Sequence, residues 1–154
     1  SRYNICMRAK LRDYSDLVST FDDAYGHAIS VLRLFRNGYA YPQIGCVVGP
    51  LTSDGPEHVK ENRRVLVELA GVLGSMFSFP VCTMQDLFSV ATLRRLKDKG
   101  YTSRHYTEFA CEILKSGYIT DVFMSPRWEK SKSARAEHDA AERFGITIHY
   151  IEYE

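Results

Sequence analysis

The feature that most limits the fold is a regular alternation of short apolar runs with longer amphipathic segments. The short runs are rich in β-branched residues and lie at 44–48 (IGCVV), 79–83 (FPVCT), 119–124 (ITDVFM) and 146–151 (ITIHYI). The segments between them have helical apolar spacing, at 57–76, 86–97, 103–115 and 127–144. This alternation predicts βαβ crossovers, and therefore an α/β fold with an open, mostly parallel sheet and helices on both faces.

The segment before the first strand has a helical pattern of its own. Apolar residues recur at helical spacing over 14–35, and Asn37-Gly38 follows as a helix stop. We therefore expect an amphipathic helical extension over 1–40 and an α/β domain over 41–154. We expect the extension either to cover an edge of the sheet or to join two subunits.

Composition excludes several classes of protein. The 154 residues carry a net charge of +1, so no global field attracts nucleic acid or an anionic membrane, and neither is predicted as a partner. No run is long and apolar enough to span a bilayer, and the first residues lack the apolar region of a signal peptide. The well-separated cysteines indicate isolated thiols in a reducing cytoplasm, so no metal site is expected. No phosphate loop, HExxH zinc motif or GxSxG elbow is present, and no cofactor is predicted.

The helix predicted over 127–144 places a carboxylate on its apolar face. At about 100° per residue, Glu137 lies at the centre of a face made of small or apolar residues: Ser133, Ala134, Ala140, Ala141 and Phe144. Burial of an unpaired carboxylate is costly, so this position indicates a functional group. The alternative is a Glu137 that is hydrogen-bonded to a neighbouring helix or loop.

The beginning of the same helix has the chemistry of an anion site. Residues 127–135 have a local excess of three positive charges, and Ser131 and Ser133 add hydroxyl groups. Because helix N-termini bind anions through free N–H groups, a phosphate site is reasonable here. The alternative is an ordinary serine cap beside solvated lysines.

Two motifs together resemble those of the nucleoside 2-deoxyribosyltransferase-like superfamily, which includes nucleoside 5′-monophosphate N-glycosidases. One is S-P-x-W-E-x-S-x-S-A-x-x-E over 125–137, followed by alanines and G-I-T-I, and the other is G-P-L-T over 49–52. The resemblance covers roughly 44–151. It implies a Rossmann-like (flavodoxin-like) sheet of about five strands, a homo-oligomer, and cleavage of the bond between a sugar and its base.

The resemblance also implies roles for individual residues. Glu137 would be the nucleophile at the anomeric carbon, where a carboxylate stabilises an oxocarbenium-like transition state. A helper acid would lie on the helix before the third strand, where Glu112 is the best candidate and His105 and Glu108 fit less well. The substrate would lie against Gly49, Pro50, Leu51, Trp128, Ser131 and Ser133. The family usually has Gly at the position of Ser133, and residues 1–40 have no counterpart in it.

Three functions follow as expectations. The first is an enzyme that cleaves a nucleotide or nucleoside, by hydrolysis or by transfer to a second base, and the positive charge near Lys130 and Lys132 favours a phosphorylated substrate. The second is a non-catalytic nucleotide-binding module of the same fold. The third is an interaction protein that works through the helix predicted over 14–35.

Overall fold

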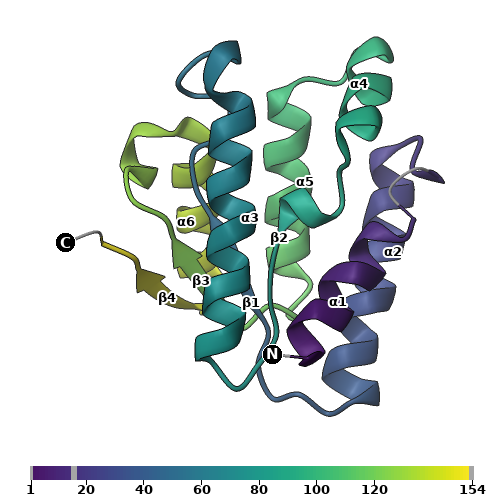
Figure 1. Ribbon diagram of the computed structural model, residues 1–154, viewed down its shortest axis with the longest axis vertical. Coiled ribbons are helices and arrows are strands. Elements are labelled where there is room, and N and C mark those ends of the chain that lie inside the picture. Colours follow the sequence, from purple (N-terminus) through teal and green to yellow (C-terminus); the bar gives the residue numbers. More distant parts are fainter. Residues whose placement is uncertain (1, 15–16, 153–154) are drawn as a thin grey trace.

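Four parallel strands form the sheet. The computed structural model describes residues 2–14 and 17–152, and in them the strands are β1 (Gly45–Val48), β2 (Val81–Thr83), β3 (Asp121–Met124) and β4 (Thr147–Tyr150). Their spatial order is β2-β1-β3-β4, and all neighbours pair in parallel (Figure 1). The predicted α/β fold is confirmed. The described residues form four strands, however, and not the five that the family resemblance implies.

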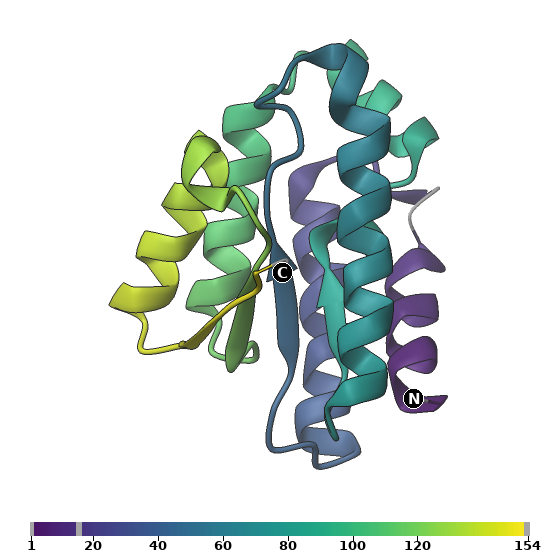
Figure 2. The same ribbon diagram turned by 60° about the vertical axis from the view of Figure 1, so that its left-hand side comes forward.

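Helices cover both faces of this sheet. Helix α3 (Val59–Met76) lies on one face, and α2 (Phe21–Arg33), α5 (Ser103–Lys115) and α6 (Lys132–Arg143) lie on the other (Figure 2). The strands serve both layers because successive side chains point to opposite faces. In β1, Cys46 and Val48 enter the larger hydrophobic cluster, and Val47 enters the smaller one under α3. Such two-sided burial explains why the sequence of β1 is continuously apolar.

The N-terminal prediction of one helix over 14–35 is wrong. The chain forms α1 (Arg2–Arg12), which was not predicted, and then α2, which starts only at Phe21. Thr20 caps α2, since its hydroxyl accepts a hydrogen bond from the backbone N–H of Asp23 at 3.1 Å. Leu17, which fits the helical spacing, is 72% exposed. Residues 15 and 16 lie outside the described part of the chain.

Helix α1 covers the outer edge of β2. The side-chain oxygen of Asn4 accepts a hydrogen bond from the backbone N–H of Val81 at 2.7 Å. This N–H lies on the open edge of β2, where it could otherwise pair with a further strand. Met7 and Leu11 on the same helix belong to the larger hydrophobic cluster together with Cys46 of β1. Residues of the predicted extension therefore share the core of the sheet and cover the β2 edge.

Two further helices begin later than predicted because local caps intervene. The helix predicted from residue 86 is preceded by a 3-10 turn (Met84–Asp86). Helix α4 (Val90–Asp98) begins only after Ser89, which caps it. The segment from residue 127 starts with Arg127 in the left-handed region at φ +66° and a 3-10 turn (Trp128–Lys130). Helix α6 begins after its cap, Ser131, whose side chain accepts from the N–H of Ala134. Ser131 thus decides where the helix that carries Glu137 begins.

Candidate functional site

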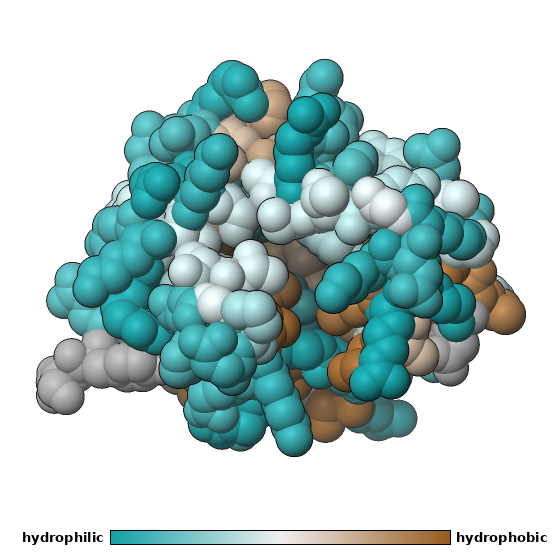
Figure 3. Space-filling view, turned by 90° about the horizontal axis from the view of Figure 1, so that it is seen from above, coloured by the Kyte–Doolittle hydropathy of each residue, from teal (hydrophilic) through white to brown (hydrophobic). Residues whose placement is uncertain are grey.

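A cavity of about 630 Å³ opens at the carboxyl edge of the sheet. Its wall combines residues from the loops after β1 and β2 with residues of α4, α5 and α6, namely Gly49, Leu51, Thr52, Val59, Met84, Gln85, Phe88, Leu93, Lys97, Gly100, Tyr101, Thr102, Ser103, Tyr106, Thr107, Phe109, Ala110, Ser133 and Glu137. Figure 3 looks onto this end of the molecule and shows a hollow with hydrophobic residues beneath a hydrophilic rim. Position and size are those of small-molecule sites in open parallel sheets.

Glu137 lies in the wall of this cavity without a protein partner. Among the described residues, none hydrogen-bonds or ion-pairs with its carboxyl group, and Ala134 and Ala141 on the same helix are fully buried. Burial raises the pKa of Glu137 to about 8. The alternative of a carboxylate held by a neighbouring helix or loop therefore does not describe this structure. Strongly perturbed acids in clefts are candidates for chemistry.

The two serines at the start of α6 have different positions. Ser133 lines the cavity one turn before Glu137, so a ligand can reach both side chains. Ser131 is buried as the cap of the helix and lies behind Ser133, with 3.2 Å between the two hydroxyl oxygens. The structure thus brings Ser133 and Glu137 together at the cavity and gives Ser131 the role of orienting the first turn.

The loop after β1 reaches the cavity through Gly49 and Leu51. A side chain at Gly49 is excluded by packing, because a Cβ built there would lie 1.8 Å from Ser125 Oγ. The amide of Asn62 in α3 holds the loop by donating to the carbonyl of Leu51 and to the carboxylate of Asp54, both at 3.1 Å. The glycine therefore permits the close approach of the β1 and β3 loops at the site.

Pro50 faces a separate and smaller cavity of about 180 Å³ on the α3 side of the loop. Asn62, Ser125 and Arg127 are among its lining residues. The Gly49–Leu51 segment thus divides two hollows, and Pro50 lies on the opposite side from Glu137.

Two of the other predicted site residues lie outside the large cavity. The Trp128 ring stacks on His138 at 4.3 Å between centroids, and it also approaches Tyr150 of β4. Glu112 is exposed on α5, and it does not line the cavity. The structure therefore leaves the expected helper acid apart from Glu137.

The positive charges predicted to bind phosphate lie mostly on the surface. Lys130, Lys132 and Arg135 are exposed, and none of them lines the cavity. Lys97 of α4 is the one cation in the cavity wall as formed by the described residues. The local charge excess at α6 thus adds to the field near Ser133 without direct contact.

The aromatic wall opposite the β1 loop was not identified as part of a site. Phe88, Tyr101, Tyr106 and Phe109 line the cavity, and Phe21 of α2 packs against all four rings at 4.9–5.8 Å between centroids. Helical spacing had indicated that Tyr106 and Phe109 point inward, but periodicity does not distinguish a packed core from the wall of a cavity. No sequence signal other than this aromatic density could have found the wall.

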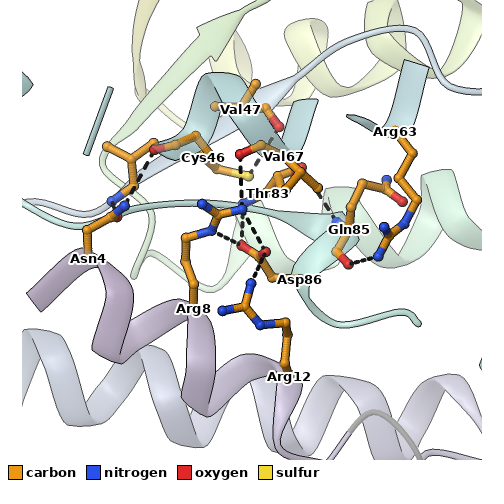
Figure 4. Close-up of polar contacts among 12 residues, drawn as sticks. Asn4, Arg8, Arg12, Cys46, Val47, Arg63, Val67, Thr83, Gln85 and Asp86 are labelled. Carbon is orange, nitrogen blue, oxygen red and sulfur yellow. Dashed lines mark hydrogen bonds and ion pairs between the residues drawn. The ribbon is translucent and has the colours of Figure 1, made fainter. Parts of the chain in front are cut away.

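Polar side chains of helix α1 contact the turn that follows β2 (Figure 4). Arg8 forms two hydrogen bonds with the buried carboxylate of Asp86, at 2.9 and 3.1 Å, and a third with the carbonyl of Val67. Asp86 also accepts from the N–H of Thr83 at the end of β2. Because Met84 and Gln85 line the cavity, this arrangement connects α1 to the wall.

Two cysteines far apart in the sequence are neighbours in the sheet. Cys46 and Cys82 are register partners on β1 and β2, and both are buried free thiols. A hydrogen bond with Cys82 and burial raise the pKa of Cys46 well above its usual range, and the nearby Glu137 adds to this effect. The Cys46 thiol is therefore a poor nucleophile. Neither cysteine lines the cavity, so the pair belongs to the packed interior of the sheet.

Comparison with models of known families, with curated proteins and with solved structures finds no match to this chain. Within residues 2–14 and 17–152, no group of three or more His, Cys, Asp or Glu side chains is arranged to hold a metal ion. In the same part of the chain, no helix has the length and apolarity needed to cross a membrane.

Proposed function

We propose that this protein cleaves the N-glycosidic bond of a nucleoside or nucleoside 5′-monophosphate, with Glu137 as nucleophile. The observation that carries the proposal is the unpaired Glu137 carboxyl group in the wall of a cavity at the carboxyl edge of a parallel sheet. The resemblance of the 125–137 motif to the deoxyribosyltransferase-like superfamily supports the same role. The proposal also includes a homo-oligomer that acts in the cytoplasm.

The proposed reaction has two steps. A Glu137 oxygen bonds to the anomeric carbon while the carbon–nitrogen bond breaks and its electron pair leaves with the base. Water then attacks the same carbon, the ester bond breaks, and its electron pair returns to the carboxylate. The base takes a proton from solvent, and the attacking water releases one. A second base in place of water would give transfer instead of hydrolysis.

The cavity offers a consistent orientation for such a substrate. Ser133 lies one turn before Glu137 and can contact the 5′ group of the sugar, and Gly49 and Leu51 bound the other side. The aromatic wall of Phe88, Tyr106 and Phe109 is suited to a planar base. Nucleotide recognition thus needs only groups that already line the cavity.

The raised pKa of Glu137 has a consequence for the rate. At neutral pH the empty site holds mostly the protonated acid, whereas a nucleophile must be ionised. We therefore expect kcat/KM to rise with pH through about 8 and then level off. A rate that is flat from pH 6 to pH 9 would contradict ionisation of Glu137 as a requirement.

The direct test is release of free base from a panel of ribonucleoside and deoxyribonucleoside 5′-monophosphates and the corresponding nucleosides, measured by chromatography. We expect Glu137→Gln to abolish release while binding persists. Glu129→Gln, an exposed change in the turn before the same helix, is the matched control and should leave the rate unchanged. Base release that is undiminished in Glu137→Gln would refute the nucleophile.

A nucleotide-binding module is the second candidate. The position of Glu112 outside the cavity favours it, because the carboxylic acid expected to assist the leaving base is then missing from the site. In that case the same panel gives saturable binding in calorimetry and no base release.

A further inference from the structure

Tyr106 occupies a fixed place in the wall of the cavity. It lies on the face of α5 that also presents Ser103, Thr107 and Ala110 to the cavity, at intervals of three and four residues. Its ring is held edge-on by Phe21 and by Phe88, at 4.9 and 5.3 Å between centroids. Such packing on two sides leaves the ring little rotational freedom, so its hydroxyl group has a defined direction.

The hydroxyl group of Tyr106 is unused by the protein. Among the described residues none accepts from it or donates to it, whereas the nearby Thr107 hydroxyl already donates to the carbonyl of Ser103 at 3.1 Å. Burial raises the pKa of Tyr106, so the group stays an O–H donor across the physiological range. A half-buried donor without a partner is costly unless a ligand or water accepts from it.

Two other groups with acidic hydrogens are less suited to assisting a departing base. Glu112 lies outside the cavity, and Lys97 is exposed on a flexible side chain at the rim. Glu137 is engaged at the sugar in the proposed reaction. Tyr106 therefore has a ring in a fixed position and a protonated hydroxyl group that is available to donate a hydrogen bond to a ligand.

We propose that Tyr106 donates a hydrogen bond to the base as it leaves, and that it is a catalytic residue in place of the expected carboxylic acid. This inference rests on the proposed glycosidase function. The electron pair of the breaking carbon–nitrogen bond leaves negative charge on the base, and the Tyr106 O–H stabilises that charge. Its proton stays on the phenol, and the base takes its proton from solvent as it is released.

The test compares Tyr106→Phe with wild type on two kinds of substrate. Adenosine and guanosine 5′-monophosphates lose an anionic base, whereas their 7-methyl counterparts carry a cationic base that leaves neutral and needs no such donor. We expect Tyr106→Phe to lower kcat about 100-fold on the first kind, with little change in KM. On the 7-methyl substrates the loss should fall below about threefold, because no negative charge develops there.

Tyr41→Phe is the matched control. Tyr41 is also a half-buried tyrosine whose pKa burial raises, but it packs on Phe35 away from the cavity, so both rates should be unchanged. A Tyr106→Phe enzyme with wild-type kcat, or with the same loss on both kinds of substrate, overturns the role of Tyr106 alone. Absence of base release by the wild type from every substrate overturns the proposed function, and this inference with it.

Discussion

Arg8 and Asp86, which are 78 positions apart, form a buried ion pair with two hydrogen bonds of 2.9 and 3.1 Å. The pair joins the first helix of the chain to the turn after β2, and that turn supplies Met84 and Gln85 to the cavity. The side chain of Asp86 is 1% exposed, so Arg8 compensates a charge that water cannot reach. The integrity of the site thus depends on a helix that lies outside the α/β unit expected from the sequence.

We predict that Arg8→Ala lowers the free energy of unfolding by about 3–5 kcal/mol, because Asp86 is left buried without its main partner. Urea unfolding followed by circular dichroism measures the change. Arg12→Ala is the control, since Arg12 is half exposed and lies 3.6 Å from the same carboxylate. Its loss should stay below about 1 kcal/mol, and equal losses in the two variants would contradict the assignment of the pair to Arg8.

We predict that Glu137→Gln makes the protein more stable at alkaline pH while abolishing base release. Burial raises the pKa of Glu137 to about 8 from 4.5, so the folded protein keeps a proton that the unfolded chain has lost. The stability contributed by this group is present below pH 4.5 and is lost as the pH rises through about 8. Thermal unfolding should show a variant that matches wild type near pH 4.5 and exceeds it by about 10 °C or more at pH 8.5.

An identical difference at both values of pH would show that Glu137 does not titrate abnormally. Glu129→Gln, at an exposed position, should follow wild type throughout.

We predict that Gly49→Ala lowers the free energy of unfolding by at least about 1–3 kcal/mol, because the new Cβ would lie 1.8 Å from Ser125 Oγ. Ser125→Gly should relieve much of this loss in the double variant, and the coupling is measured by a double-mutant cycle in urea. Gly26→Ala provides the opposite control. Gly26 lies within α2 with nothing near its Cβ position, so the same change there should stabilise by about 0.5–1 kcal/mol. Destabilisation of equal size at both glycines would refute the steric argument.

We predict that Asp121→Asn weakens the fold at neutral pH but not in acid. Burial acts to raise the pKa of Asp121, yet hydrogen bonds from His149, Thr120 and Gln43 outweigh burial and hold it below its usual 3.8. The ionised carboxylate therefore adds stability that is present above about pH 4 and is lost as the pH falls below it. Urea midpoints measured at pH 7 and pH 3 should show a gap between variant and wild type that narrows in acid. A constant gap would assign the effect to packing.

Apolar periodicity was enough to determine the order of the elements. The four strand runs and the helix at Ser103–Lys115 lie where their patterns predicted. In β1 and β2 the reason is that both faces of the strand are buried, which favours apolar side chains throughout. The same reasoning put Glu137 on the small face of its helix, and the structure places it in the cavity wall. Apolar periodicity was therefore enough to predict the α/β fold class and to single out Glu137, the central residue of the proposal.

The features that periodicity missed are held by polar contacts between distant segments. Helix α1 buries Asn4 and Arg8 alongside Met7 and Leu11, so its inner face does not look apolar in the sequence. Those polar groups find their partners on α3, on β2 and in the turn that follows β2, which are more than fifty residues away. No local pattern encodes such pairings, because the partner is defined only when the chain is folded.

The sequence by itself thus determined an α/β chain with a parallel sheet and an inward-facing carboxylate near its end. Only the tertiary structure decided what surrounds that carboxylate. It turned Tyr106 from a core residue into part of the cavity wall, and it left Trp128 and Glu112 outside. The reason is physical: helical and strand periods report which side of an element is covered, whereas the neighbours that cover it, and the space left between them, depend on how the elements pack.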